Sequence, residues 1–378
     1  MKKKLIGSLL VIIVVLGLLL GLNQPLRTAV YRSVFRHSSY IISDKDTVYS
    51  FGYAGVQKFL LNQDGKTTLL KENDSFCHNC IVGYLMGRSG CIVNNYLYVA
   101  ARSYLGGRYK SKEKNYKKGC LYILDKSSLE ILKEIETDYS MIEVKCLDTC
   151  MVVSGLQGFN IYNVKDVLNP QLTYQFRTEK AWEFQGCEIF VHDGRRYVAF
   201  ARWADGLSIY DITDINNVKL FRNIRIEETK LNGVALPKGL QQFRVVLDYP
   251  YLYSTIGPTK RLIGTSSDIR GIMAYDFSNL DSIHCICVTI PKKYWYTKVN
   301  GDPQPTHIAI YGNHIYTNFS EKGIVSFVKN RNNNEIKFEK IINASDGRQI
   351  LPIHINKDGI LLMGDYRSED IISYNLKK

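Results

Sequence analysis

The side chains with the clearest chemical potential recur at matching points of separate β-type segments. Pro305-Thr-His-Ile308 and Pro352-Ile-His-Ile355 each place a histidine shortly before an apolar run. Counting back eight positions from the start of three such runs reaches Glu143, Arg244 and His307. A small change of register adds Glu188 and His354. Imidazoles and carboxylates can exchange protons, and arginine binds oxyanions through paired hydrogen bonds. We predict one polar cluster at the mouth of a central channel, on the face that carries the long loops, as a candidate site for an anionic ligand. It is made of Glu143, Glu188, Arg244, His307 and His354.

Three arginines lie near the ends of related apolar runs, where they could reach the rim of the same site: Arg102, Arg202 and Arg367. The cluster has three open interpretations. Its charges could pair across a water-filled channel, bind a ligand, or act as acid and base in a hydrolase or lyase for an acidic glycan. Two histidines and two carboxylates could also hold a divalent metal. Because they come from different repeats, we predict neither a metal nor a cofactor.

The elements that must position these side chains belong to a sequence repeat. Each copy has a glycine, an apolar residue, two variable positions and usually an aromatic residue. Six copies begin at Gly55, Gly119, Gly158, Gly206, Gly271 and Gly323. A seventh copy, Asp370-Ile-Ile-Ser-Tyr374, lacks the glycine. An apolar, β-favouring run precedes every copy, and successive runs are 46 to 63 residues apart. Such a period indicates a repeat architecture.

Each unit has room for four short strands, which is typical of a β-propeller blade. A lone four-stranded sheet cannot bury both faces, whereas radially packed blades cover one another. No long amphipathic helix separates the units, which argues against an α/β fold. We therefore predict an all-β, seven-bladed β-propeller over residues 29–378. The seventh unit ends after its third strand, so we expect the segment 29–36 to complete the last blade.

Two copies carry a more specific resemblance. Gly206-Leu-Ser-Ile-Tyr-Asp-Ile-Thr-Asp-Ile-Asn-Asn-Val218 and Gly158-Phe-Asn-Ile-Tyr-Asn-Val-Lys-Asp-Val-Leu-Asn-Pro170 resemble LVIVD-type propeller repeats. The fifth unit keeps Gly-Ile-Met-Ala-Tyr-Asp from Gly271, and the other units keep the spacing alone. The resemblance implies a β-propeller of a kind often exported or surface-associated in bacteria. It implies no fixed activity and no catalytic residues.

The N-terminus carries a membrane signal. Lys2, Lys3 and Lys4 precede an uncharged run from Leu5 to Leu22. As a helix, this run approaches the roughly 30 Å thickness of the hydrocarbon core, and the lysines favour a cytoplasmic N-terminus. We predict a transmembrane anchor and short linker over residues 1–28, with the propeller on the extracytoplasmic side. A cleaved signal peptide is the alternative.

The net charge limits the classes of possible partner, and the cysteines bear on whether the chain forms disulfides. The net charge is +13, and export of the chain makes nucleic acid an unsuitable partner. Anionic lipid head groups, an acidic glycan or an acidic protein are better candidates. Nine cysteines include the CxxC of Cys77 and Cys80, which could form a disulfide in an oxidising compartment, or all the thiols could remain free.

Long insertions are expected on one face of the ring: Lys71–Ser89, Ser103–Lys118, Arg225–Gln242, Gly257–Arg270 and Pro291–Thr306. Recognition residues commonly lie on loops carried by a rigid scaffold. No nucleophile-elbow, zinc or phosphate-binding fingerprint supports an enzyme. We therefore predict a membrane-tethered binding or scaffolding module with its ligand or partner on the loop-rich face. The alternative is a glycan hydrolase or lyase at the channel mouth.

Overall fold

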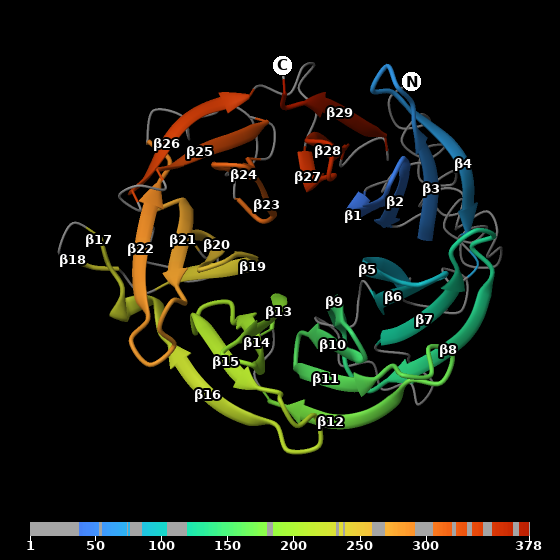
Figure 1. Cartoon of the computed structure of the whole chain (residues 1–378), viewed down its shortest axis with the longest axis horizontal. Helices are drawn as coiled ribbons and strands as arrows, with labels where there is room; N and C mark the ends of the chain where they lie inside the picture. The colour runs from blue at the N-terminus through green and yellow to red at the C-terminus, as the bar shows by residue number, and fades with distance from the viewer. Residues whose placement is uncertain are drawn as a thin grey trace, which may run out of the picture.

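The chain folds as an all-β, seven-bladed β-propeller, which confirms the predicted fold class. Seven sheets stand around a central axis, as Figure 1 shows. The computed structural model describes residues 38–377 except for 53–54, 74, 76–84, 104–118, 180–183, 232–233, 237–238, 259–268, 292–304, 320–322, 331–334, 343–349 and 366–369.

In each blade the strands run from the axis outward in chain order. The first four blades contain β1 (Ser38–Asp44), β2 (Thr47–Gly52), β3 (Gly55–Leu61), β4 (Thr67–Asn73), β5 (Leu85–Val93), β6 (Tyr96–Ser103), β7 (Gly119–Asp125), β8 (Ile131–Thr137), β9 (Met141–Leu147), β10 (Cys150–Gly155), β11 (Gly158–Asn163), β12 (Gln171–Arg177), β13 (Gly186–His192), β14 (Arg195–Ala201), β15 (Leu207–Asp211) and β16 (Lys219–Ile224).

The last three blades contain β19 (Leu240–Asp248), β20 (Tyr251–Pro258), β21 (Gly271–Asp276), β22 (His284–Thr289), β23 (Ile308–Tyr311), β24 (His314–Asn318), β25 (Ile324–Asn330), β26 (Glu335–Ile342), β27 (Ile350–Ile355), β28 (Ile360–Asp365) and β29 (Ile371–Asn375). Between the fourth and fifth blades lie a short 3₁₀ helix, η2 (Ile226–Glu228), and a small hairpin of β17 (Lys230–Leu231) and β18 (Val234–Ala235).

Burial follows the position of a strand within its blade. All six residues of β10 are buried, whereas the outermost strand β8 alternates between half-buried and exposed residues. The hydrophobic cores lie between neighbouring blades. In one of them, Phe159 of the third blade packs against Phe200 and Tyr210 of the fourth, with ring centroids 4.5 Å and 5.0 Å apart. This packing between blades accounts for the apolar second and third strands of each unit.

The glycine at the start of the third strand is needed for close packing. Gly206 has a φ of +94°, and a Cβ built there would lie 2.1 Å from the carbonyl oxygen of Ile224. Gly158 meets the carbonyl oxygen of Phe176 in the same way, at 2.0 Å. A side chain at either position would therefore force the third and fourth strands apart.

The first and last blades are neighbours, because β1 contacts β27 and β28 while β4 contacts β29 (Figure 1). The described part of the last blade has three strands. The predicted closing strand 29–36, the predicted anchor 5–22 and the Cys77–Cys80 pair all lie outside the described residues.

Within the described ranges, no helix is both long enough and apolar enough to span a membrane.

The connections divide between the two faces of the ring. Connections from the second to the third strand, and from one blade to the next, lie on one face, and the remaining turns lie on the other. The first group includes the 15 residues between Ser103 and Gly119, whereas β1 and β2 are joined by only Lys45 and Asp46. Some predicted insertions are shorter than expected, because β4 extends to Asn73 and β5 begins at Leu85.

Candidate functional site

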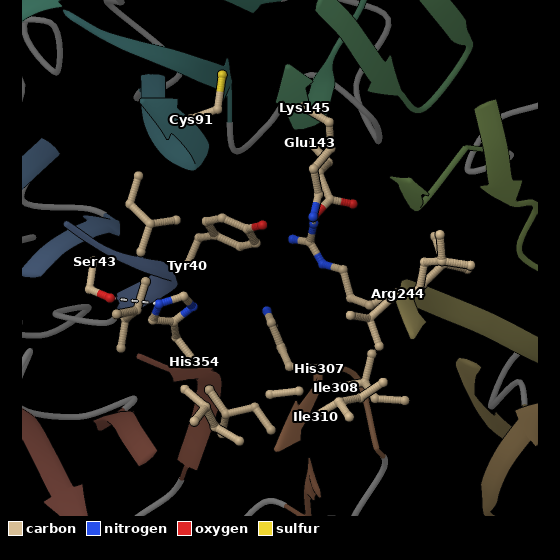
Figure 2. Close-up of a pocket in the computed structure, with 18 of the residues that line it drawn as sticks. Tyr40, Ser43, Cys91, Glu143, Lys145, Arg244, His307, Ile308, Ile310 and His354 are labelled. Atoms are coloured by element: carbon tan, nitrogen blue, oxygen red, sulfur yellow. Dashed lines mark hydrogen bonds and ion pairs between the residues drawn. The ribbon is translucent and has the colours of Figure 1, made fainter. Parts of the chain in front are cut away.

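The innermost strands of six blades line a cavity of about 650 Å³ on the propeller axis (Figure 2). These strands are β1, β5, β9, β19, β23 and β27. Side chains alternate between the two faces of a strand, so every second residue of an innermost strand can face the channel. The lining reaches Asp248 and Gly312, where β19 and β23 end at the face with short turns.

Arg244 and Glu143 form a buried ion pair across the cavity wall. Nη1 of Arg244 lies 2.7 Å from Oε1 of Glu143, and their side chains are 7% and 2% exposed. The second carboxylate oxygen of Glu143 accepts a hydrogen bond of 2.8 Å from the backbone N–H of Cys187. Arg244 lies where the register of β19 shifts against β20. This pair therefore ties the third blade to both the fourth and the fifth.

Lys145 and Glu188 form a second ion pair, with Nζ 3.1 Å from Oε2. Burial lowers the pKa of Lys145, but the nearby Glu188, Tyr40 and Glu143 raise it by more. The net result is a pKa well above the ordinary value for lysine. Burial raises the pKa of Glu188, and the Lys145 ammonium offsets part of that rise. At neutral pH Lys145 therefore stays charged beside the carboxyl group of Glu188.

Both predicted histidines line the cavity in the neutral form. Burial, and then the positive charges of Arg244 and Arg88, hold the pKa of His307 well below its usual range. Burial and Lys145 lower the pKa of His354 to about 4. Nε2 of His307 lies 3.1 Å from the carbonyl oxygen of Ser39, and Nε2 of His354 lies 2.9 Å from Oγ of Ser43, as the dashed line in Figure 2 marks.

Tyr40 completes the polar part of the cavity. Its hydroxyl points toward the centre of the site in Figure 2. The Arg244 guanidinium lies 5.1 Å from the centroid of its ring. Burial raises the pKa of Tyr40 to about 12, so its hydroxyl remains a hydrogen-bond donor at physiological pH.

The structure brings most of the predicted cluster together. Glu143, Arg244, His307 and His354 all line the cavity, and Glu188 joins them through Lys145. Two predicted rim arginines are not part of the lining. Arg102, near the end of β6, lies opposite Gly119 of β7 in the sheet. Arg202 donates a hydrogen bond to Oγ of Ser208 and forms an ion pair with Asp205. Arg367 lies outside the described residues. The predicted ligand-binding role of the cluster stays a prediction.

Among the polar lining residues that the sequence analysis did not identify are Tyr40, Ser43 and Lys145. The period of two that places Glu143 toward the channel also places Lys145 there. Counting back eight positions from Val48, the start of the first apolar run, reaches Tyr40. These two could therefore have been found by applying the same rule to every unit. Ser43 has no such signal, because its contact with His354 joins residues that are 311 positions apart.

The arrangement suits binding better than acid–base chemistry. The carboxylates of Glu143 and Glu188 are held by cations, and neither His307 nor His354 is paired with a carboxylate within the described part of the chain. A general base must reach the proton it removes, and neutral histidines held beside Arg244 and Lys145 are weak bases. Among the described residues, no group of three His, Cys, Asp or Glu side chains could hold a metal ion.

The fold and this axial cavity define the chain as a seven-bladed β-propeller with a polar central channel. Comparison with solved structures agrees. The WD40 propeller domain of Doa1 is similar, with a TM-score of 0.58 and 10% identity, over 91% of this chain and 95% of that chain. The Neurospora crassa Pan2 WD40 domain has a TM-score of 0.58 and 10% identity, over 90% of each chain. The Myceliophteria thermophila Cps50 (Swd1) propeller has a TM-score of 0.55 and 10% identity, over 91% and 99%.

No family model and no curated protein matches the sequence. At 10% identity, the solved structures show that the fold is shared and carry no information about activity. The resemblance to LVIVD repeats therefore stays a prediction from the Gly158 and Gly206 segments.

Proposed function

We propose that the chain is a membrane-tethered, extracytoplasmic binding or scaffolding propeller that presents its loop-rich face to an anionic partner. One observation carries the proposal, namely that the long connections, all on one face, also hold the basic excess of the sequence. The tether rests on the lysines and apolar run at residues 2–22, and the LVIVD-like segments support an exported propeller.

The charge of the two faces differs. The five long connections, 74–84, 104–118, 225–239, 259–270 and 290–307, together contain fifteen Lys or Arg and six Asp or Glu. The connection 104–118 alone has six Lys or Arg against one Glu. The short turns of the other face contain six Lys or Arg and nine Asp or Glu. A face with one sign of charge attracts and orients an oppositely charged partner.

The test compares two variants of equal net charge. In the first, the connection 104–118 loses five charges through substitution of lysine by glutamine at Lys110, Lys112, Lys114, Lys117 and Lys118. In the control, five lysines in or beside the short turns are changed in the same way: Lys45, Lys66, Lys165, Lys357 and Lys377. The full chains, held in nanodiscs, are bound to immobilised heparin as a polyanionic probe and eluted with increasing NaCl.

We expect the loop variant to elute at lower salt than the unaltered chain, because fewer screened charge contacts hold it to heparin. The control variant should elute close to the unaltered chain. Equal losses in both variants would show that net charge alone governs binding, and would refute a role for the loop-rich face.

A further inference from the structure

We propose that Cys91 and Cys146 are a redox-active thiol pair on the wall of the axial cavity. By exchange with the disulfide of a small thiol compound or of another protein, they form a disulfide that joins the second and third blades. The pairing rests on the contact between two innermost strands. Its oxidation in the cell rests on the extracytoplasmic location proposed above, because disulfides form and persist in oxidising compartments.

The two cysteines lie on neighbouring innermost strands that are held in register. β5 and β9 contact each other, and the backbone N–H of Val144 donates a hydrogen bond of 3.3 Å to Oγ of Ser89. Both strands start at the loop-rich face, so they run in the same direction. Cys91 and Cys146 each lie two residues beyond that hydrogen bond. Because side chains two positions apart point to the same side of a strand, this register places Cys91 beside Cys146.

The two thiols are in contact. The thiol of Cys146 hydrogen-bonds the thiol of Cys91, and both side chains pack against the hydrophobic core between the second and third blades. Figure 2 shows the Cys91 sulfur turned away from the centre of the cavity. Both cysteines are reduced in this structure. A disulfide requires Cβ atoms about 3.8 Å apart, and rotation about the Cα–Cβ bonds of thiols that already touch can bring the two sulfurs together.

An oxidant can reach this pair through the cavity. Cys91 and Cys146 both line the cavity and are half-buried, whereas Cys120, Cys150 and Cys187 are buried. Cys285 is also half-buried, but it lies on the outermost strand β22 of its blade and does not line the cavity. It therefore serves as the matched control.

The reaction is thiol–disulfide exchange in two steps. The attacking species is a thiolate, and burial together with the hydrogen bond to Cys91 raises the pKa of the Cys146 thiol well above its ordinary value. We therefore assign the first attack to Cys91. Its thiolate bonds to one sulfur of the oxidant and releases the other half as a thiolate.

In the second step Cys146 gives its proton to a released thiolate and attacks the Cys91 sulfur. The second half of the oxidant then leaves as a thiol. In total the two protein thiols lose two electrons and two protons, and one oxidant disulfide is reduced to two thiols.

The test equilibrates the purified full chain, in a mild detergent, with glutathione and glutathione disulfide at several ratios. Acid stops the exchange, free thiols are blocked with N-ethylmaleimide, and non-reduced peptides are identified by mass spectrometry. We expect the crosslinked peptide of Cys91 and Cys146 to accumulate as the ratio shifts toward glutathione disulfide. The midpoint of thermal unfolding should rise on oxidation, because the bond closes a loop as long as the 55 positions from Ser89 to Val144.

Single substitutions test the assigned roles. Cys91→Ser and Cys146→Ser should each abolish the crosslink and the rise in the unfolding midpoint, whereas Cys285→Ser should keep both. Cys146→Ser should also leave a stable glutathione adduct on Cys91, because the thiol that resolves the mixed disulfide is absent. With the reduced chains, all three variants should unfold close to the unaltered chain, which shows that they are folded.

The outcomes separate the pair from its location. Absence of the crosslink at every ratio, or a lasting glutathione adduct on Cys91 of the unaltered chain, would overturn the pair and leave the proposed location unaffected. The same peptides are then measured in cells that express the full chain and are quenched with acid before lysis. A crosslink in these cells would support both the pair and its oxidation. A crosslink that forms only in the purified chain would overturn the oxidation in the cell and count against the extracytoplasmic location.

Discussion

Removing one partner of the buried Arg244–Glu143 pair should destabilise the propeller far more than removing both. In Glu143→Gln, the Arg244 guanidinium, 7% exposed, keeps its charge without a carboxylate. In Arg244→Met, the Glu143 carboxylate, 2% exposed, keeps only the N–H of Cys187 at 2.8 Å. Leaving such a charge unpaired costs about 3–5 kcal/mol, so each single variant should lose that much free energy of unfolding.

The double variant Glu143→Gln/Arg244→Met removes both charges. Glutamine can still accept the hydrogen bond from Cys187, and methionine fills much of the arginine's volume with apolar atoms. Replacement of a whole buried ion pair is often close to neutral. We therefore expect the double variant to be more stable than either single variant by about 2 kcal/mol or more, which is a strong departure from additivity.

The assay is urea unfolding of the full chain in a mild detergent, followed by tryptophan fluorescence. The midpoint and slope are compared for each variant, since a changed slope would signal a departure from a single transition. Arg195→Met is the control, because Arg195 pairs with Asp211 but its side chain is 57% exposed; its loss should cost less than about 1 kcal/mol. If the double variant loses the sum of the two single losses, the two residues do not act as a pair and the reasoning is wrong.

Three further predictions follow from other parts of the molecule. Because the pKa of His354 is lowered to about 4 by burial and by Lys145, the folded state resists a proton that the unfolded state accepts at about 6.5. The contribution of His354 to the free energy of unfolding should therefore be complete above pH 6.5 and should fall by about 3 kcal/mol between pH 6.5 and 4. In unfolding curves measured across that range, His354→Gln should show a smaller dependence of this free energy on pH. Gly206→Ala should cost about 2 kcal/mol or more, since φ is +94° and the added Cβ meets the carbonyl of Ile224. Gly194→Ala, also at positive φ but with nothing within 4 Å, should cost about 1 kcal/mol, and thermal unfolding of both variants compares them. Burial raises the pKa of the Cys187 thiol well above its ordinary value, so iodoacetamide at pH 8 should label it slowly in the folded chain and rapidly after unfolding, as mass spectrometry of the peptides would show.

The sequence was sufficient for the architecture because the repeat encodes it locally. Six of the seven copies repeat the glycine that the close approach at Gly158 or Gly206 requires, and all seven repeat the apolar second strand that the blade interface requires. The number of copies then sets the number of blades. The partners of the individual channel residues are not encoded locally. The hydrogen bond from the backbone of Cys187 to Glu143 and the contact of Ser43 with His354 join different blades, and these appear only when the ring closes.

The same distinction explains which site residues could be predicted. The rule of counting back from the second strand finds positions that face the axis, and it correctly gathers Glu143, Arg244 and His307. The rule does not say at which height along the axis a given side chain lies, and therefore whether it reaches the cavity. Arg102 and Arg202 lie at strand ends on the loop-rich face, and the cavity lining does not include them. Strand position alone could not separate these two groups.

The stability of the ring does not account for the charges in its channel. A buried ion pair replaced by apolar residues of similar size is often neutral or even stabilising, and the neighbouring wall of Ile42, Ile310 and Ile355 shows that this channel accommodates aliphatic side chains. The blade interfaces, such as that around Phe159, already supply the apolar burial that holds the blades together. The two cations that line the cavity, Lys145 and Arg244, pair with Glu188 and Glu143, and the Tyr40 hydroxyl faces the same cavity. Each ion pair joins residues of two different blades, so these charges fix which residues meet across the axis, a role that apolar burial does not supply.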